Sequence, residues 1–287
     1  MTSPGEMATQ PEAARQRSRA AWDAIAPGWY SEREELWKTS RPVSEWMVRR
    51  LDPQPGDTVL ELAAGLGDTG FMAARRVGET GRVIITDFAP EMVAAARRRA
   101  EEVGVENAEF RTLDAERMDL ETDSVDGVLC RWAYMLMIDP ATAFAETRRV
   151  LKPGGRLAFS VWAAPERNPG LSLASRVLVE LGHIPPPDPE APGAFVMADP
   201  RRIRELVVGA GFAEPEIEEV SFRRPFADQD DYWRFLTETS SALSPALRAL
   251  PGEARAAVRQ RVREAAQPYH FGEGYDFPAV CMNVVTH

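Results

Sequence analysis

The chain has 287 residues, which is long for one plain domain and short for two full ones. Its 44% hydrophobic and 27% charged residues are ordinary for a globular protein. The formal net charge of −10 argues against bulk nucleic-acid binding and against adhesion to anionic membranes, because both depend on positive charge. We therefore expect one core domain with an elaboration and no nucleic-acid partner.

The sequence shows no membrane span, signal peptide or metal motif. No apolar run approaches the roughly 20 residues of a membrane helix. Residues 1–14 are polar, without the basic start and apolar core of a signal peptide, and are predicted to be a flexible tail. Cys130 and Cys281 lie in apolar runs without metal-ligand or redox spacing. We expect two buried thiols in a reducing, cytoplasmic protein.

Two helices are predicted before the first strand. Residues 15–35 have apolar positions near helical spacing, with an interruption at Pro27 and Gly28. Residues 42–51 form the second helix, and turn-forming residues fill positions 52–57.

Strands and helices then alternate. The predicted strands are residues 58–62, 82–86, 108–112, 125–131 and 156–162. The helices between them are residues 71–77, residues 89–103 and a segment that begins at Asp139 and Pro140. Such alternation predicts a doubly wound parallel sheet, with a ligand crevice beyond the carboxyl ends of its strands.

The pattern changes after residue 162. Many prolines surround one short helix at residues 171–181, in a segment too long for an ordinary loop. The remaining predicted elements are a helix opened by Asp199 and Pro200, a strand at 215–222, amphipathic helices at 228–250 and 252–266, and a strand at 279–285.

A glycine-rich turn follows the first predicted strand. Glu61 precedes Gly65, Gly67 and Gly70. Residues without a large side chain let a bulky ligand approach the backbone, and the following helix offers free N–H groups. A turn without a ligand would show the same glycines, so this motif alone leaves both interpretations open.

Acidic residues follow the next two predicted strands. Asp87 could accept hydrogen bonds from both hydroxyls of a ribose, or cap the following helix. Asp114, followed by Ala115, could accept a hydrogen bond from the amine of adenine, or form a turn. Together with the glycine-rich turn, these residues favour one adenosine-containing ligand.

These motifs resemble those of class I S-adenosylmethionine-dependent methyltransferases, in the broad group that includes the ubiquinone/menaquinone-biosynthesis methyltransferases. The resemblance covers residues 20–162, and Ala63 stands where the first glycine of the family's first motif usually lies. The matching segments, in the family's order, are residues 59–67, 86–88 with Met92, 113–115, 124–132 and 146–157.

The resemblance implies a Rossmann-like methyltransferase fold. This is an α/β, doubly wound, mostly parallel seven-stranded sheet with an antiparallel last strand and a helical cap. The implied division is a flexible tail (1–14), N-terminal helices with the S-adenosylmethionine-binding core (15–162), an inserted cap segment (163–198), a return to the core (199–225), a helical cap (226–275) and the last core strand (276–287).

The resemblance also implies the cofactor, S-adenosylmethionine, and the residues that bind it. These residues are Tyr30, Glu61, Ala63, Gly65, Gly67, Asp87, Phe88, Met92, Asp114, Ala115, Arg131 and Trp132. Tyr30, like Trp22, could close over the cofactor or simply pack an amphipathic helix. Arg131 could orient the cofactor or an acidic substrate, or form a surface ion pair. No cluster of acidic residues suggests a metal.

The expected reaction is in-line attack on the sulfonium methyl by a small metabolite, at oxygen, carbon or nitrogen. Apolar cap residues such as Phe195 and Trp233 favour an apolar or aromatic substrate, although they also suit an ordinary core. A base is needed only for a protonated nucleophile. Tyr134, His183 and His270 are the candidates, and each has a structural alternative, in helix packing or a solvated loop.

Two other functions stay open at this point. A protein that binds S-adenosylmethionine without catalysis would keep the same motifs and lack a base. A nicotinamide-dependent oxidoreductase would share the sheet, but its glycine fingerprint has a different spacing from Ala63, Gly65 and Gly67.

Overall fold

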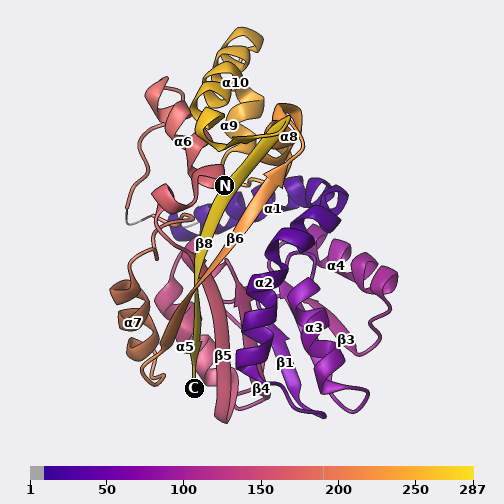
Figure 1. Cartoon of the computed structure of the whole chain (residues 1–287). Helices are drawn as coiled ribbons and strands as arrows, with labels where there is room; N and C mark the ends of the chain where they lie inside the picture. Colours follow the sequence, from indigo (N-terminus) through magenta and orange to yellow (C-terminus); the bar gives the residue numbers. More distant parts are fainter. Residues whose placement is uncertain (1–9, 190) are drawn as a thin grey trace, which may run out of the picture.

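A twisted sheet with helices on both faces forms the centre of the molecule (Figure 1). The computed structural model describes residues 10–189 and 191–287. The strands are β1 (Thr58–Glu61), β2 (Arg82–Asp87), β3 (Ala108–Thr112), β4 (Val125–Arg131), β5 (Leu151–Trp162), β6 (Glu216–Phe226), β7 (His270–Phe271) and β8 (Gly274–Thr286).

The strand order is β3-β2-β1-β4-β5-β8-β6, and the short β7 pairs with β8 outside this path. Strands β1 to β5 are parallel to one another, whereas β8 is antiparallel to both β5 and β6. The predicted doubly wound, mostly parallel sheet with an antiparallel last strand is confirmed. The two-residue β7 is an addition to the seven predicted strands.

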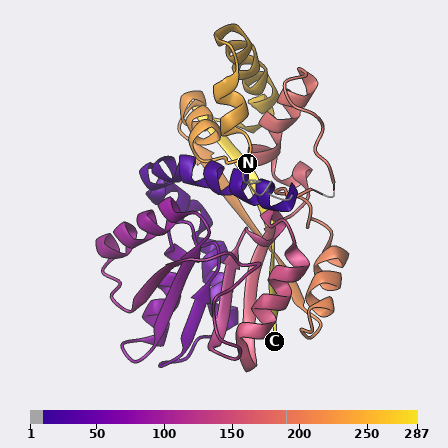
Figure 2. The same ribbon diagram turned by 180° about the vertical axis from the view of Figure 1, so that it is seen from behind.

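Helices cover both faces of the sheet. They are α1 (Gln10–Ser31), α2 (Arg33–Leu51), α3 (Asp68–Val77), α4 (Pro90–Val103), α5 (Pro140–Val150), α6 (Pro169–Glu180), α7 (Pro200–Gly209), α8 (Gln229–Glu238), α9 (Ser244–Ala249) and α10 (Gly252–Ala266). Figures 1 and 2 show α2 and α3 on one side of the sheet and α5 on the other. None of the described helices is both long and apolar enough to cross a membrane.

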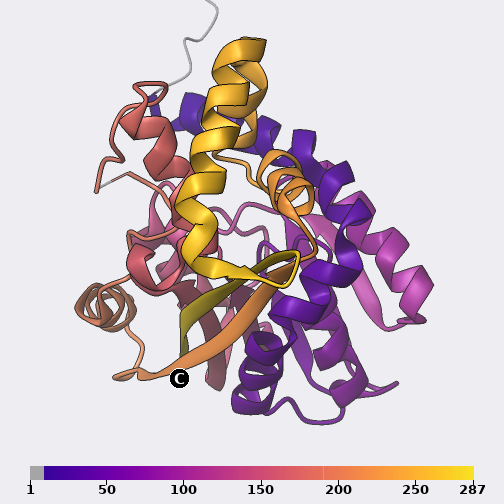
Figure 3. The same cartoon turned by 45° about the horizontal axis from the view of Figure 1, so that its top comes forward.

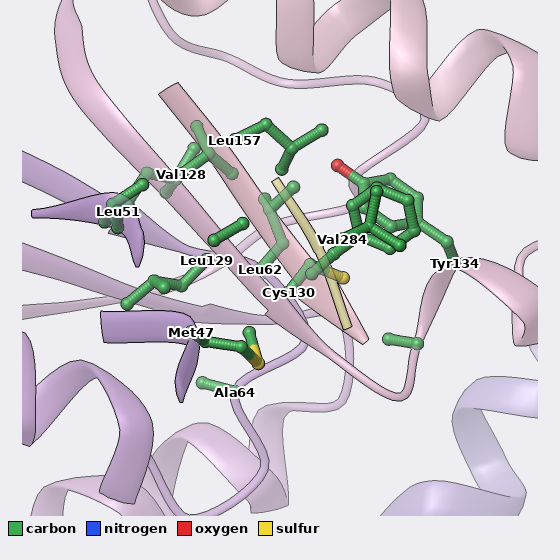
Figure 4. Close-up of a cluster of buried hydrophobic side chains, with 14 of the residues drawn as sticks. Met47, Leu51, Leu62, Ala64, Val128, Leu129, Cys130, Tyr134, Leu157 and Val284 are labelled. Atoms are coloured by element: carbon green, nitrogen blue, oxygen red, sulfur yellow. The ribbon is translucent and has the colours of Figure 1, made fainter. Parts of the chain in front are cut away.

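The main hydrophobic core lies between the sheet and these helices. Figure 4 shows Met47 and Leu51 of α2 converging on Val128 and Leu129 of β4. Cys130, next to the last residue of the same strand, is fully buried, and burial raises the pKa of its thiol. Cys281 is also buried and free, so both thiols lie where their apolar sequence surroundings predicted.

A second hydrophobic cluster lies at the far end of the paired strands β6 and β8. These strands pair from Glu216↔Val285 to Phe226↔Tyr275 and rise beyond the rest of the sheet (Figure 1). Buried side chains of α6, α8, α9 and α10 pack there against Tyr275 and Phe277. Seen from above, these helices gather over the carboxyl end of the sheet (Figure 3). In this article they are called the cap.

Several predicted boundaries were wrong. Helix α1 begins at Gln10, inside the predicted tail of residues 1–14, of which residues 1–9 lie outside the described part of the chain. It continues through Pro27, and α2 starts at Arg33 and includes Pro42. A proline inside a helix removes one backbone hydrogen bond, but packing on both sides can outweigh that cost.

Two elements outside the N-terminal region also differ. The helix predicted at residues 228–250 is two helices, α8 and α9, because the chain bends between Thr239 and Ser244. Strand β5 begins at Leu151, before the predicted start at residue 156, and it is irregular there, because its register against β4 shifts between Val125 and Gly127.

Candidate functional site

A cavity opens at the carboxyl ends of β1, β2 and β4, beneath α1, which crosses above the sheet in Figure 2. Its empty volume, which includes the open mouth, is about 940 Å³. The lining from the sheet side includes Ala63, Ala64, Gly65, Asp87, Phe88, Leu113, Asp114, Ala115, Glu116, Arg131, Trp132 and Ala133. The lining from α1 is Arg15, Ser18, Trp22 and Trp29.

The loop after β1 forms the floor of the cavity. Ala63, Gly65 and Gly67 all have left-handed backbone conformations, with φ of 47°, 56° and 81°. A Cβ atom on Gly65 would lie 3.2 Å from the ring of Trp29, so only a very small residue fits between the loop and α1. Gly67 does not line the cavity. It precedes α3 and packs against Phe71, which a Cβ atom would approach to 2.7 Å.

Asp87 joins the loops that follow β1 and β2. One carboxylate oxygen accepts a hydrogen bond of 3.0 Å from the N–H of Gly65, and the other accepts one of 3.0 Å from the N–H of Ala89. Burial raises the pKa of Asp87 to about 6. The carboxylate therefore both organises the loops and faces the cavity, where its remaining lone pairs can accept further hydrogen bonds.

Glu61 lies behind the cavity and does not line it. Its carboxylate accepts a hydrogen bond of 2.9 Å from the N–H of Gly70, in the first turn of α3. Burial raises its pKa to about 8, although the charge of Arg131 opposes this shift. Glu61 thus positions the start of α3.

The segment after β3 supplies the acidic wall of the cavity. One oxygen of Asp114 accepts a hydrogen bond of 2.9 Å from the N–H of Glu116 and so forms a turn. The other lies 3.7 Å from Nε of Arg15, too far for a hydrogen bond. Arg15 forms its close ion pair with Glu116 instead. Asp114 therefore keeps one oxygen free to accept a hydrogen bond in the cavity.

Helix α1 is the roof of the cavity. Trp22 and Trp29 meet edge to face, with ring centroids 5.6 Å apart. The indole N–H of Trp29 donates a hydrogen bond of 2.8 Å to the carbonyl of Thr239, at the end of α8. Gly28 packs so closely there that a Cβ atom would lie 2.4 Å from the carbonyl oxygen of Glu238. The roof is therefore fastened to the cap.

Besides Glu61 and Gly67, two further predicted cofactor residues, Tyr30 and Met92, do not line the cavity. The hydroxyl of Tyr30 donates to Glu102 at 2.5 Å, and its ring packs under Arg98, on the other side of α1. Met92 is buried with Ile25 and Ala26 between α1 and α4.

The sequence interpretation missed Arg15, Ser18 and Trp29 as cavity residues. They share one face of α1 with Trp22, because positions 15, 18, 22 and 29 recur at helical spacing. This signal was lost when the predicted helix was interrupted at Pro27.

Arg131 and Trp132 form the inner wall. Trp132 has a left-handed φ of 58°, which is unusual for a bulky residue, and its ring stacks on Trp162 at 4.1 Å. The guanidinium of Arg131 lies 4.9 Å from the ring centre of Trp132. Left-handed strain in a cavity wall is typical of a functional site.

The three candidate bases lie outside the cavity. Tyr134 is fully buried, its hydroxyl is 2.7 Å from that of Thr147, and its ring stacks on Phe144. His183 and His270 are exposed, and the ring of His270 meets Tyr275 edge to face. Among the described residues, no histidine lines the cavity and no group of His, Cys, Asp and Glu could hold a metal ion.

Comparison with known families gives a match over the strands that carry this cavity. Residues 53–177 match the family model described as "Methyltransferase domain". The chain is 40% identical over 106 residues to arsenite methyltransferase of Halobacterium salinarum, covering 37% of this chain and 27% of that protein. It is 38% identical over 122 residues to ubiquinone/menaquinone biosynthesis C-methyltransferase of Acidiphilium cryptum, covering 42% and 46%. The matched part spans less than half of either relative.

Solved structures share the fold over most of the chain. The YcgJ protein of Bacillus subtilis has a TM-score of 0.58 and 19% identity, covering 86% of this chain and 97% of that one. A SAM-dependent methyltransferase from Aquifex aeolicus has a TM-score of 0.52 and 18% identity, covering 90% and 97%. Residues 53–177 are therefore a methyltransferase domain, within a chain that has the Rossmann-like methyltransferase fold.

Proposed function

We propose that the cavity binds S-adenosylmethionine and that the protein transfers its methyl group to a small molecule. The observation that carries this proposal is Asp87, whose carboxylate is held by the N–H groups of Gly65 and Ala89 at the end of β2. It lies in a cavity of a methyltransferase domain, and the relatives are named as methyltransferases.

The lining residues fit such a cofactor. Asp87 would accept hydrogen bonds from the ribose hydroxyls, and the free oxygen of Asp114 would accept one from the adenine amine. Ala63 and Gly65 leave room for the ligand against the backbone. Bound S-adenosylmethionine supplies a methyl group that its sulfonium charge has already activated.

The protein's contribution is alignment in a site that excludes water. Trp22 and Trp29 of the roof shield the cavity from solvent. Trp132 begins an apolar wall that continues through Trp162 and Phe222, where rings lie 4.1 and 6.0 Å from that of Trp132. This wall supports an apolar or aromatic methyl acceptor.

Calorimetric titration with S-adenosylhomocysteine tests the cofactor, and transfer of an isotopically labelled methyl group to a panel of small aromatic metabolites tests the reaction. We expect micromolar binding and labelled products. Because Asp87 would also suit the ribose of a nicotinamide cofactor, NAD is the control ligand. Folded protein that prefers NAD, or binds neither ligand, would contradict the proposal. Binding without transfer would favour a non-catalytic S-adenosylmethionine-binding protein, which is supported by the observation that no histidine in the described part of the chain lines the cavity.

The affinity for S-adenosylhomocysteine is expected to fall about tenfold between pH 7 and pH 5, because protonation of Asp87 removes the acceptor for the ribose. The folding stability of the free protein changes with pH in the opposite direction. Since the pKa of Asp87 is raised from 3.8 to about 6, its protonation stabilises the free fold, and this contribution is lost as the pH rises through about 6. Calorimetry between pH 5 and pH 7 measures the change in affinity, and thermal melts over the same range measure the change in stability.

The matched control for this pH dependence is Asp87→Asn, which keeps the shape of the side chain and cannot ionise. Its affinity should be weak and constant between pH 5 and pH 7. Glu61, whose pKa is raised from 4.5 to about 8, stays mostly protonated in the folded protein between pH 5 and pH 7, so it adds little to the pH dependence of binding. It ionises in the unfolded chain, so it adds to the loss of stability as the pH rises, in wild type and in Asp87→Asn alike. A pH dependence of binding that persists in Asp87→Asn would assign it to another group.

A further inference from the structure

Arg224 of β6 is buried without a counterion. Only 7% of its surface is exposed, and within the described residues its guanidinium makes no hydrogen bond and no ion pair. The guanidinium lies over the face of Phe235, 4.7 Å from the ring centre. A buried arginine normally has an anionic partner, because removing an unpaired charge from water costs free energy. The neighbouring Arg223 has the ordinary arrangement, with an exposed side chain bound to Asp276.

The charged and titratable groups around Arg224 do not neutralise it. They are Arg131, which is also positively charged, and the phenol of Tyr232, whose O–H donates a hydrogen bond to the carbonyl of Gly170. Burial, together with the charge of Arg131, lowers the pKa of Arg224 to about 10, so it remains a cation at neutral pH.

Arg131 is not fully neutralised either. Two acids, Glu61 and Asp68, lie close enough to affect the pKa of Arg131. Of these, Asp68 is already bound to Arg99 at 3.2 Å. The pKa of the other, Glu61, is raised to about 8, so at neutral pH it is mostly protonated. Arg131 and Arg224 therefore lie near one another, and neither has a carboxylate that is paired with it alone.

The position of Arg224 relates it to the cavity. Alternation along β6 places Phe222, Arg224 and Phe226 on one face of the strand. The ring of Phe222 lies 6.0 Å from that of Trp132, in the cavity wall. The ring of Phe226 lies 5.3 Å from that of Phe235, in the cap. Arg224 thus lies between the inner wall of the cavity and the cap.

We propose that Arg224, assisted by Arg131, binds a carboxylate of the methyl acceptor, whose apolar body packs against Trp132 and the aromatic residues of the cap. This substrate class rests on the proposed function. A guanidinium presents two parallel N–H donors that match a carboxylate, and the surrounding rings exclude competing water. The acceptor is then an aromatic or otherwise apolar acid.

Binding of matched acids and esters tests this proposal. The probes are benzoate, naphthoate and anthracene carboxylate, each compared with its methyl ester, on full-length protein saturated with S-adenosylhomocysteine. We expect at least one acid to bind about tenfold or more tightly than its ester. In Arg224→Met this preference should disappear, whereas the affinities for the ester and for S-adenosylhomocysteine should stay unchanged.

Two further variants keep the test decisive. Arg223→Met removes a neighbouring, exposed arginine and should keep the acid preference. Arg224→Lys keeps the charge but lacks the two parallel N–H donors of the guanidinium, so it should bind the acid several-fold more weakly than wild type. This variant provides the test if Arg224→Met does not fold. The melting temperature of free Arg224→Met should equal or exceed that of wild type, because the variant removes an unpaired buried charge.

The outcomes separate this inference from the proposed function. Failure of wild type to bind S-adenosylhomocysteine would refute the cofactor. Normal cofactor binding with no acid bound, or with acid and ester bound equally, would overturn only the carboxylate site. An acid preference that persists in Arg224→Met would also overturn it. Weakened S-adenosylhomocysteine binding in Arg224→Met would assign the arginine to the cofactor's own carboxylate and overturn the substrate role.

Discussion

Replacing Asp87 by alanine is expected to weaken the binding of S-adenosylhomocysteine about a hundredfold or more. The carboxylate would accept hydrogen bonds from two ribose hydroxyls, and bonds to a charged group contribute about 1.5 kcal/mol or more each. Two of them amount to about 3 kcal/mol, or two factors of ten in affinity. The substitution also releases the N–H groups of Gly65 and Ala89, which loosens both loops. Calorimetric titration at pH 7 measures the loss.

Asp126→Ala is the matched control for this loss. Asp126 also lies on a strand of the sheet and also accepts a backbone hydrogen bond, from the N–H of Thr58 at 2.9 Å. It stands at the amino end of β4, away from the cavity, where Lys152 neutralises it at 2.8 Å. This variant should bind S-adenosylhomocysteine like wild type. If Asp87→Ala does so as well while remaining folded, the ribose is not bound at the end of β2.

Replacing Gly28 by alanine is expected to detach the roof of the cavity. The added methyl group would lie 2.4 Å from the carbonyl oxygen of Glu238, and a backbone atom cannot rotate away. We expect the free energy of unfolding to fall by roughly 1–3 kcal/mol, as in other overpacked sites. The affinity for S-adenosylhomocysteine should fall about tenfold, because Trp22 and Trp29 no longer cover the ligand. Urea unfolding and calorimetry measure the two effects.

Gly209→Ala separates this effect from helix propensity. Gly209 ends α7, and a Cβ atom there meets nothing within 4 Å. Alanine is favoured over glycine in helices by about 1 kcal/mol, so this variant should be as stable as wild type or slightly more stable. Equal stability and equal affinity in Gly28→Ala would show that α1 does not need its close contact with α8.

The sheet could be predicted because its signals are local. The apolar runs at β1, β2, β4 and β5, and the capped helices between them, are each visible within about ten residues of sequence. Alternation along the chain then predicts a parallel sheet, since parallel neighbouring strands need a crossover connection, which is usually a helix. The same logic placed Asp87 and Asp114 at one edge, and both line the cavity.

The N-terminal helices were predicted less well because local signals there conflict with packing. Pro27 and Pro42 both suggest a boundary, yet both lie inside helices. The helix α1 is covered by α4 on one side and by α8 on the other, and these contacts outweigh one missing hydrogen bond. Only that packing decides that Trp29, rather than Tyr30, faces the cavity.

The sequence by itself determined the succession of strands and helices along the chain, the acidic residues at the strand ends and the glycine turn, because each depends on short-range chemistry. The tertiary structure alone decided the roof, the burial of Tyr134 and the place of Arg224. Arg224 is separated from Arg131 by 93 positions of sequence, and β6 alone looks like an ordinary exposed strand with charged residues. A charge is isolated only by what packs around it, and that packing comes from segments that are distant along the chain.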